Sequence, residues 1–140
     1  IGEQKVDDLS ITEQILVYDA EGKLTKAHNL KVGDKVRIEL TVKCGKNMEY
    51  ITLNDQRGAC FEPVDKVSTY DYQHGCCMYR EIKDFATNIF IPYLSKGTYV
   101  LNYDCYVTNS GSFGIGIATI QCQYAPQFVA HSAGNSVIVK

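Results

Sequence analysis

The clearest pattern along the chain is an alternation of apolar and polar residues over ten positions, 35–44. Apolar residues take every second position, namely Val36, Ile38, Leu40, Val42 and Cys44. Charged or hydroxyl residues stand between them, namely Lys35, Arg37, Glu39, Thr41 and Lys43. A period of two is typical of a strand with one buried and one exposed face, whereas a helix would scatter the polar residues around its circumference. The segment therefore predicts a β-strand with Leu40 inside and Glu39 outside.

Shorter segments of similar character follow one another along the rest of the chain. The predicted strands cover residues 14–18, 23–27, 48–53, 59–61, 78–83, 85–91, 98–108, 113–124 and 136–139. Turn sequences rich in Gly, Asn and Asp separate most of them, and residues 109–112 are interpreted as a hairpin turn. Residues 64–77 are polar and rich in Tyr, and they are interpreted as a long connection between sheets. Pro126 is expected to end the strand before it, because proline lacks the donor of the ladder.

The phase of the later strands assigns further residues to the core. The expected inward residues are Leu101, Tyr103, Cys105, Val107, Ala118, Ile120, Cys122 and Tyr124. Regular short strands without an amphipathic helix predict an all-β fold, a two-sheet antiparallel β-sandwich. Because neither a linker nor an internal repeat is apparent, we expect residues 1–140 to form a single domain.

Composition narrows the classes of partner. The chain has 140 residues, of which 45% are hydrophobic and 21% charged, so it can build a core and is not of disordered composition. Its formal net charge is −2, which supplies no basic surface for a phosphate backbone, and we expect no nucleic-acid partner. No apolar run approaches the ~18 residues of a membrane-spanning segment, so we expect no insertion in a membrane.

The six cysteines leave two alternatives open. Cys44, Cys105 and Cys122 continue the apolar faces of predicted strands, which favours reduced thiols in the core. An oxidising compartment would permit at least one disulfide instead. Cys76 and Cys77 are adjacent, too close for the two-residue spacing of zinc and thioredoxin-like sites, and we expect one thiol to point inward and one outward.

The remaining reactive residues do not form a catalytic pattern. His74 lies two residues from Cys76, and a cysteine nucleophile needs such a base, but no hydrolase signature surrounds the pair. The carboxylates lack the spacing of a calcium loop. Surface tyrosines could line a sugar-binding groove, although the chain has no Trp. We expect no enzymatic activity, no metal and no cofactor.

Several short motifs occur in an order and spacing that resemble one known family. They are residues 30–36 (LKVGDKV), 54–59 (NDQRGA), 79–84 (YREIKD), 94–99 (LSKGTY), 111–113 (GSF), 118–121 (ATIQ) and 124–126 (YAP). The ordered set resembles the C-terminal macroglobulin-like domain of bacterial α2-macroglobulins, most of all the large versions from Bacteroides-type bacteria. The resemblance covers roughly residues 10–140, nearly the whole chain.

The resemblance implies a macroglobulin-like β-sandwich and a role. Full-length relatives are extracytoplasmic protease traps, in which a bait region is cut and the chain rearranges around the protease. The chain is then a C-terminal fragment of a much larger protein in the periplasm or at the cell surface. Its partners are the other domains of that protein, a thioester-domain equivalent among them, and proteases through the full-length protein. The alternative from the residues alone is a free-standing extracytoplasmic sandwich that binds carbohydrate or adhesion ligands.

The resemblance also implies a site. In thioester-bearing relatives, aromatic residues of this domain cover the thioester, and one of them belongs to a Tyr-x-Pro motif. Tyr124 and Pro126 match that motif and are the expected thioester-covering rim. An activated acyl group survives only where water is excluded, and an aromatic ring is a suitable cover. Gln123 departs from the pattern, because many relatives have Met there. The structural alternative is that Tyr124 is only the last inward residue of its strand.

Overall fold

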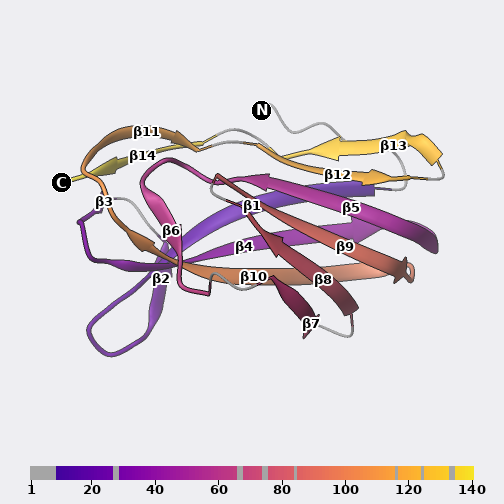
Figure 1. Cartoon of the computed structure of the whole chain (residues 1–140), viewed down its shortest axis with the longest axis horizontal. Helices are drawn as coiled ribbons and strands as arrows, with labels where there is room; N and C mark the ends of the chain where they lie inside the picture. The colour runs from indigo at the N-terminus through magenta and orange to yellow at the C-terminus, as the bar shows by residue number, and fades with distance from the viewer. Residues whose placement is uncertain are drawn as a thin grey trace.

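A computed structural model describes residues 9–26, 29–65, 68–73, 76–83, 85–115, 117–123, 125–132 and 135–140. The regular elements in these ranges are all strands, which confirms the all-β prediction (Figure 1). They are β1 (Leu9–Tyr18), β2 (Leu24–Lys26), β3 (Asn29–Leu30), β4 (Lys35–Cys44), β5 (Met48–Gln56), β6 (Phe61–Pro63), β7 (Thr69–Gln73), β8 (Cys76–Ile82), β9 (Ala86–Leu94), β10 (Gly97–Val107), β11 (Gly111–Ile115), β12 (Ala118–Cys122), β13 (Ala125–His131) and β14 (Asn135–Val139).

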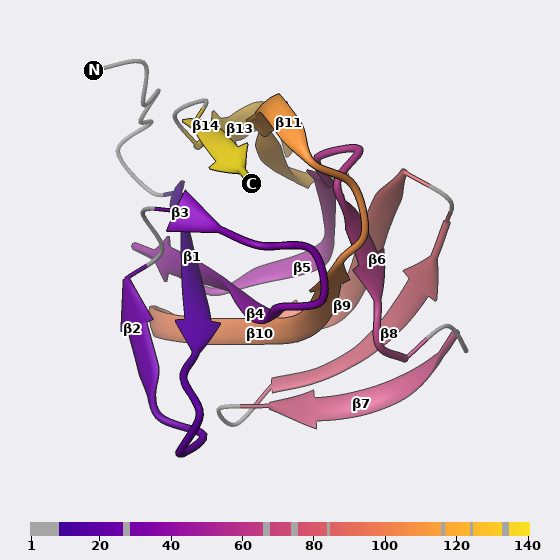
Figure 2. The same ribbon diagram turned by 90° about the vertical axis from the view of Figure 1, so that its left-hand side faces the viewer.

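Two large sheets form the sandwich. One has the strand order β2-β1-β4-β10-β6, and the other has the order β13-β12-β5-β9-β8-β7. A third, smaller sheet has the order β11-β14-β3 and lies at one end of the molecule, beside the C-terminus (Figures 1 and 2). Every strand pair is antiparallel except β14 with β3, which is parallel. The two-sheet antiparallel prediction is confirmed, and the small end sheet is an addition to it.

The core lies between the inner faces of the two large sheets. All five apolar positions of the alternating segment are buried on β4, and the predicted core residues Leu40, Tyr103 and Ile120 are buried with them. In β10, the inward residues Leu101, Tyr103, Cys105 and Val107 alternate with half-exposed or exposed neighbours. One contiguous apolar cluster spans both sheets, so a period of two in the sequence becomes one dry layer in the structure.

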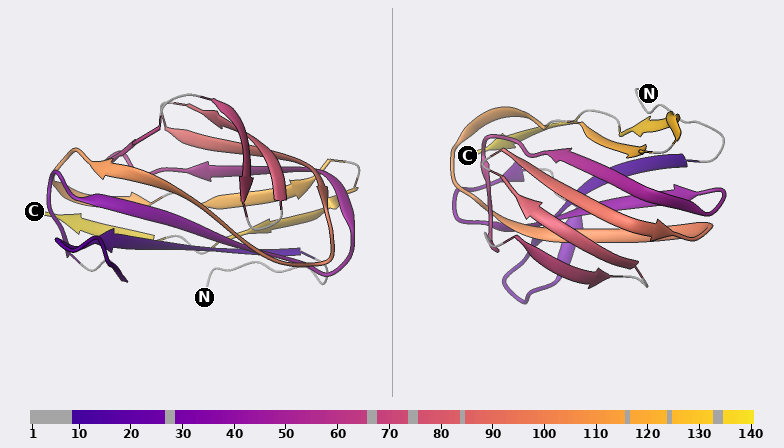
Figure 3. Two further views of the ribbon diagram at one scale, coloured as in Figure 1. Left: turned by 90° about the horizontal axis from the view of Figure 1, so that it is seen from below. Right: turned by 45° about the vertical axis from the view of Figure 1, so that its right-hand side comes forward.

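The predicted long connection over residues 64–77 is wrong in its second half. Thr69–Gln73 forms β7, the edge strand of its sheet, and β8 begins at Cys76 rather than Met78. The two strands form an antiparallel hairpin at one side of the molecule (Figure 3). β7 lacks a clear apolar alternation, and this explains why its sequence did not indicate a strand.

The C-terminal third also differs from the prediction. Residues 113–124 are two strands in different sheets, because β11 pairs with β14 whereas β12 pairs with β5 and β13. Residues 109–112 therefore lead from the large sheet into the small one and do not close a hairpin. Pro126 does not end a strand but lies within β13, an edge strand of its sheet, where a missing donor is tolerated.

Candidate functional site

The outer face of the six-stranded sheet carries a row of aromatic side chains. Tyr70 on β7, Tyr79 on β8 and Phe90 on β9 are cross-strand neighbours, and Thr52 on β5 continues the row. The Tyr70 and Tyr79 rings meet edge to face with centroids 4.9 Å apart, and the Tyr79 and Phe90 rings stack at 6.5 Å. Both separations are typical of favourable aromatic pairs. The row forms because these four positions share the outward phase of adjacent strands.

This row forms the floor of a groove of about 870 Å³. Tyr50, Cys77, Pro92 and Gln123 also line it. Several of its aromatic side chains are open to solvent, with Tyr70 82% and Tyr50 47% exposed. Exposed apolar surface gathered in one place is typical of a binding site, unlike single apolar residues scattered over a surface. We call this surface the aromatic groove.

The backbone is strained at one point of the aromatic groove. Tyr50 has a φ of 57°, and among the described residues it alone has a positive φ without being glycine. The register with β9 passes from the pair Glu49–Tyr93 directly to the pair Ile51–Ile91. Such a conformation is rare for a bulky residue, costs roughly 1–3 kcal/mol and is concentrated at functional sites.

Gln123 holds the strained residue in place. Its backbone N–H donates to the Tyr50 carbonyl at 3.0 Å, and its side-chain Nε2 donates to Thr52 Oγ1 at 2.7 Å. Gln123 is also the residue directly before Tyr124. The aromatic groove is therefore joined by hydrogen bonds to the segment that carries the predicted rim.

A polar ladder runs beside the aromatic row on the same face. Gln56 Nε2 donates to Asn54 Oδ1 at 2.7 Å, and Asn54 Nδ2 donates to Asn88 Oδ1 at 2.5 Å. Asn88 Nδ2 in turn donates to Glu81 Oε1 at 3.0 Å. The face is thus divided into an apolar half and a half that presents amide and carboxylate groups.

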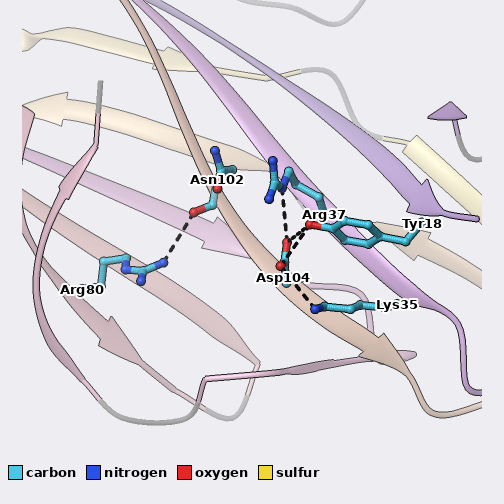
Figure 4. Close-up of polar contacts among 6 residues, drawn as sticks. All are labelled: Tyr18, Lys35, Arg37, Arg80, Asn102 and Asp104. Carbon is cyan, nitrogen blue, oxygen red and sulfur yellow. Dashed lines mark hydrogen bonds and ion pairs between the residues drawn. The ribbon is translucent and has the colours of Figure 1, made fainter. Parts of the chain in front are cut away.

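A second polar cluster lies on the outer face of the five-stranded sheet (Figure 4). The Tyr18 hydroxyl donates to both carboxylate oxygens of Asp104, at 3.2 and 3.1 Å. Arg37 Nε donates to Asp104 Oδ1 at 3.3 Å, and Lys35 Nζ lies 3.9 Å from Oδ2. Lys35 Nζ and Arg37 Cζ also lie over the Tyr18 ring, 5.2 and 5.6 Å from its centroid, respectively. The opposite charges of this cluster pair with one another across β1, β4 and β10. We therefore assign the cluster a structural role.

Figure 4 also shows how the two large sheets are joined at their β8 and β10 sides. Arg80 on β8 donates from Nη1 to the carbonyl of Asn102 on β10 at 3.4 Å. Its Nη2 lies 3.0 Å from Asp71 Oδ2 on β7. Arg80 therefore fixes the β7–β8 hairpin to the opposite sheet and so supports the floor of the aromatic groove from inside.

The cysteines follow the predicted phase. Cys44, Cys105 and Cys122 are buried, and all six cysteines of the chain are free thiols. The sulfur atoms of Cys44 and Cys122 donate to the carbonyls of Lys46 and Glu49, at 2.8 and 3.3 Å. Burial raises the pKa of the Cys105 thiol to about 12. These thiols behave as small apolar core residues.

Cys76 and Cys77 point to opposite sides of β8, as predicted. Cys76 is buried, and burial, with a smaller contribution from neighbouring Cys77, raises its pKa to about 11. It is therefore a thiol rather than a nucleophilic thiolate at neutral pH. Cys77 is exposed and lines the aromatic groove. His74, which was considered as a base for Cys76 in the sequence analysis, lies outside the described residues.

The predicted rim remains a prediction. Tyr124 lies outside the described residues, and of Pro126 the structure describes the backbone within β13. The individual residues that line the aromatic groove were not identified from the sequence. Its signal in the sequence is a set of aromatic residues on the outward phase, Tyr79 and Phe90 among them, because an outward strand position is normally polar.

Two classes of site are absent from the described ranges. Among these residues no three or more His, Cys, Asp or Glu side chains gather in a way that could bind a metal ion. The same part of the chain contains no helix with the length and hydropathy needed to cross a bilayer.

Comparison with known proteins identifies the family. Residues 9–127 match the family described as the bacterial alpha-2-macroglobulin MG10 domain. A search of curated proteins finds no match. Among solved structures, Salmonella alpha-2-macroglobulin reacted with methylamine superposes with a TM-score of 0.80 at 21% identity, over 97% of this chain and 9% of that one.

Two Escherichia coli structures give the same result. Trypsin-activated alpha-2-macroglobulin has a TM-score of 0.78 at 18% identity, over 97% of this chain and 10% of that one. The native fragment from domain MG7 to the C-terminus has a TM-score of 0.77 at 18% identity, over 97% of this chain and 24% of that one. The chain thus spans a small part of each of these alpha-2-macroglobulin chains. Since the family match extends over most of the sequence, the chain belongs to the bacterial alpha-2-macroglobulin MG10 domain family.

Proposed function

We propose that this domain is a non-catalytic interaction and structural module of an α2-macroglobulin-like, protease-trapping inhibitor. In this proposal residues 1–140 are a C-terminal fragment of a larger protein that works in the periplasm or at the cell surface. The proteases are partners of the whole protein, and the partner of this domain is a neighbouring domain of the same protein. The family match supports this proposal, together with the small share of each relative that the chain covers.

The aromatic groove is the observation that carries the proposal, and we assign it to the contact with the neighbouring domain. It gathers Tyr50, Tyr70, Tyr79 and Phe90 on one sheet face, and Tyr70 and Tyr50 are widely exposed in the domain alone. Aromatic side chains are enriched at the centres of protein interfaces because they bury a large area with few rotatable bonds. The strained backbone of Tyr50 fits a surface that is shaped for a partner.

The rim pair, Tyr124 and Pro126, belongs to the same contact in this proposal. Gln123, which lines the aromatic groove and bonds Tyr50 and Thr52, directly precedes Tyr124. A neighbouring thioester domain seated on the aromatic groove would therefore have the rim beside it. The Tyr124 ring would then keep water from the activated acyl group.

The full-length protein provides the test of the contact. Tyr70→Ser in the aromatic groove should weaken docking of this domain and raise its rate of release by limited proteolysis. Tyr106→Ser is the matched control, because Tyr106 is also an exposed strand tyrosine, at 46%, but lies on β10 in the other sheet. Equal proteolysis rates for the two variants and the wild type would contradict the assignment of the aromatic groove.

The rim is tested separately in a parent protein that has a thioester. Tyr124→Ala should speed the reaction of the thioester with methylamine while the melting temperature of the domain stays unchanged. Tyr106→Ala, at an exposed tyrosine of β10, provides the comparison and should leave the methylamine rate unchanged. An unchanged methylamine rate in Tyr124→Ala would leave Tyr124 with a structural role alone.

One observation favours a second function, binding of a neutral carbohydrate by a free-standing sandwich. The aromatic row lies beside the polar ladder that includes Asn54 and Asn88. A sugar can place its apolar C–H face on the aromatic rings and its hydroxyl groups on the amides. A glycan array probed with the isolated domain separates the two functions. Saturable binding that Tyr70→Ser abolishes would support the carbohydrate function over the domain contact.

A further inference from the structure

A pair of acidic side chains lies inside the sandwich, away from the aromatic groove. Glu13 on β1 and Asp55 on β5 come from opposite sheets, and Asp55 is fully buried. Glu13 as a whole residue is half-buried, but both of its carboxyl oxygens are buried. Two carboxylates that meet in an apolar interior are rare, because removing each charge from water is costly.

The hydrogen bonds around the pair are incomplete. The Tyr103 hydroxyl, from β10, donates to Asp55 Oδ2. No group of the described residues donates to Asp55 Oδ1 or to either carboxyl oxygen of Glu13. Buried acceptors are nearly always paired in folded proteins, so three such oxygens together require a donor.

We propose that Glu13 and Asp55 share one proton, and that this proton joins the two sheets across the core as an alkaline-sensitive lock. A protonated Glu13 carboxyl donates to the Asp55 carboxylate and supplies the missing donor. With the Tyr103 hydroxyl on its other oxygen, Asp55 is then bonded to β1 and β10 at once. The lock therefore connects the central strand β5 of one sheet to two strands of the other.

The electrostatics around the pair agree with a proton in this position. Burial, followed by the hydrogen bond to Asp55 and the charge of Asp55, raises the pKa of Glu13 from its ordinary 4.5 to about 10. Burial and the charge of Asp55 likewise raise the pKa of Tyr103 well above its usual value, so the hydroxyl keeps its own proton. Like charges that approach in an apolar site cannot both ionise, and one of them retains a proton.

The surrounding strands offer little to neutralise a second negative charge. The register partners of the pair are Leu40 on β4, Thr87 on β9 and Ala118 on β12, all of them uncharged. From β10 the facing titratable groups are Tyr103 and Cys105, whose thiol senses the charge of Asp55. The charge of Arg57 lowers the pKa of Cys105, whereas Asp104 and Cys60 raise it and carry no positive charge.

Two further groups complete the surroundings of the pair. Arg57, just after β5, is a nearby buried cation: its Nη1 donates to Thr87 Oγ1 at 2.6 Å and its Nη2 to the Lys83 carbonyl, while its buried Nε has no partner among the described residues. On β13, which also packs on β1, Ala130 is buried, and the half-buried His131 pairs with Thr119 on the outer phase of β12. Burial and Asp55 are the causes of the raised pKa of Glu13, and Arg57 is not among them, so we assign the balance of the pair to the proton.

The coupling between proton binding and folding determines how stability changes with pH. The folded state holds the Glu13 proton more tightly than the unfolded chain, so its contribution to stability is complete below about pH 4.5 and decreases as pH rises. For one proton the folding equilibrium constant falls by up to tenfold per pH unit until the raised pKa is reached. Glu13→Gln removes this dependence, since the amide N–H₂ donates to Asp55 at every pH.

The experiment compares chemical unfolding of the 140-residue chain at several pH values between 5 and 9. Wild type should lose stability steadily across this range relative to Glu13→Gln, which should be the more stable protein at pH 9. Glu49→Gln is the matched control, because Glu49 is an exposed glutamate on β5, the strand of Asp55, and it should follow the wild type. Parallel pH profiles of wild type and Glu13→Gln would overturn the proposal.

A spectroscopic measurement keeps the proposal testable if a variant folds poorly. The infrared spectrum of folded wild type at pH 7 should contain a protonated carboxylic-acid band, which titrates away at high pH and is missing in Glu13→Gln. Absence of this band at pH 7 would contradict a shared proton. A chelator that destabilises the wild type but not Glu13→Gln would identify a bound cation in place of the proton and would also overturn the proposal.

Discussion

At the scale of single residues, two neighbours on β4 show that the face a side chain occupies determines how much it contributes to stability. Leu40 is fully buried between the sheets, whereas Glu39 lies on the outer, half-exposed side of the same strand. The sequence predicts this contrast, because the alternation over 35–44 is long enough to settle the face of every residue.

Leu40→Ala should lower the free energy of unfolding by about 2–5 kcal/mol, since it removes buried methyl groups and leaves a cavity. Glu39→Ala should change stability by less than about 1 kcal/mol, as is usual for surface positions. Thermal and urea unfolding of the two variants check the prediction. Comparable losses in both would mean that the strand is packed with the opposite phase.

The sequence did not predict which polar residues lie inside the core. Glu13 stands on the same inward phase of β1 as Ile11 and Ile15, and Asp55 lies beyond residue 53, where the predicted strand ends. Binary patterning treats an acidic residue as outward-facing by default. It cannot indicate a carboxylate whose partner lies on a strand about forty residues away.

At the scale of elements, strands were predicted best where they cross the centre of a sheet. β4 was predicted with its exact ends, and β10 within one residue at each end. Both are central strands with one dry face, which makes their alternation regular. β7 and β13 are edge strands and were missed, because an edge strand tolerates polar residues and proline.

β8 supports a prediction about thiol chemistry. A thiol reagent should modify Cys77 rapidly in the folded domain, whereas Cys44, Cys76, Cys105 and Cys122 should react only on unfolding. Burial limits access to these four thiols, and for Cys76 and Cys105 it also raises the pKa. Mass spectrometry after timed labelling, with Cys77→Ser as the control, measures the order. Early labelling of Cys76 would show that β8 opens readily.

At the scale of the whole molecule, the aromatic groove that we propose for docking lies on a sandwich with one contiguous apolar core. The aromatic groove is supported from behind by Arg80, which fixes the β7–β8 hairpin to the opposite sheet. A surface that is held by both sheets keeps its shape before the partner arrives, and this lowers the entropy lost on association.

The isolated domain should therefore leave proteases active. Mixed in stoichiometric amount with a model protease, residues 1–140 should not slow cleavage of a large protein substrate, because a trap needs a bait segment and a closing cage that we assign to other domains. The full-length protein serves as the positive control. Inhibition by the domain alone would contradict its role as a docking module.

The parallel pairing of β14 with β3 has a consequence for synthesis on the ribosome. β14 lies between β11 and β3, so among the described strands it is β14 that joins these two segments, which are far apart in the sequence. The edges of β3 and β11 that pair with β14 therefore stay unpaired in the nascent polypeptide until translation has passed residue 139. Unpaired strand borders recruit other chains, so this interval is the moment at which the domain most needs a chaperone.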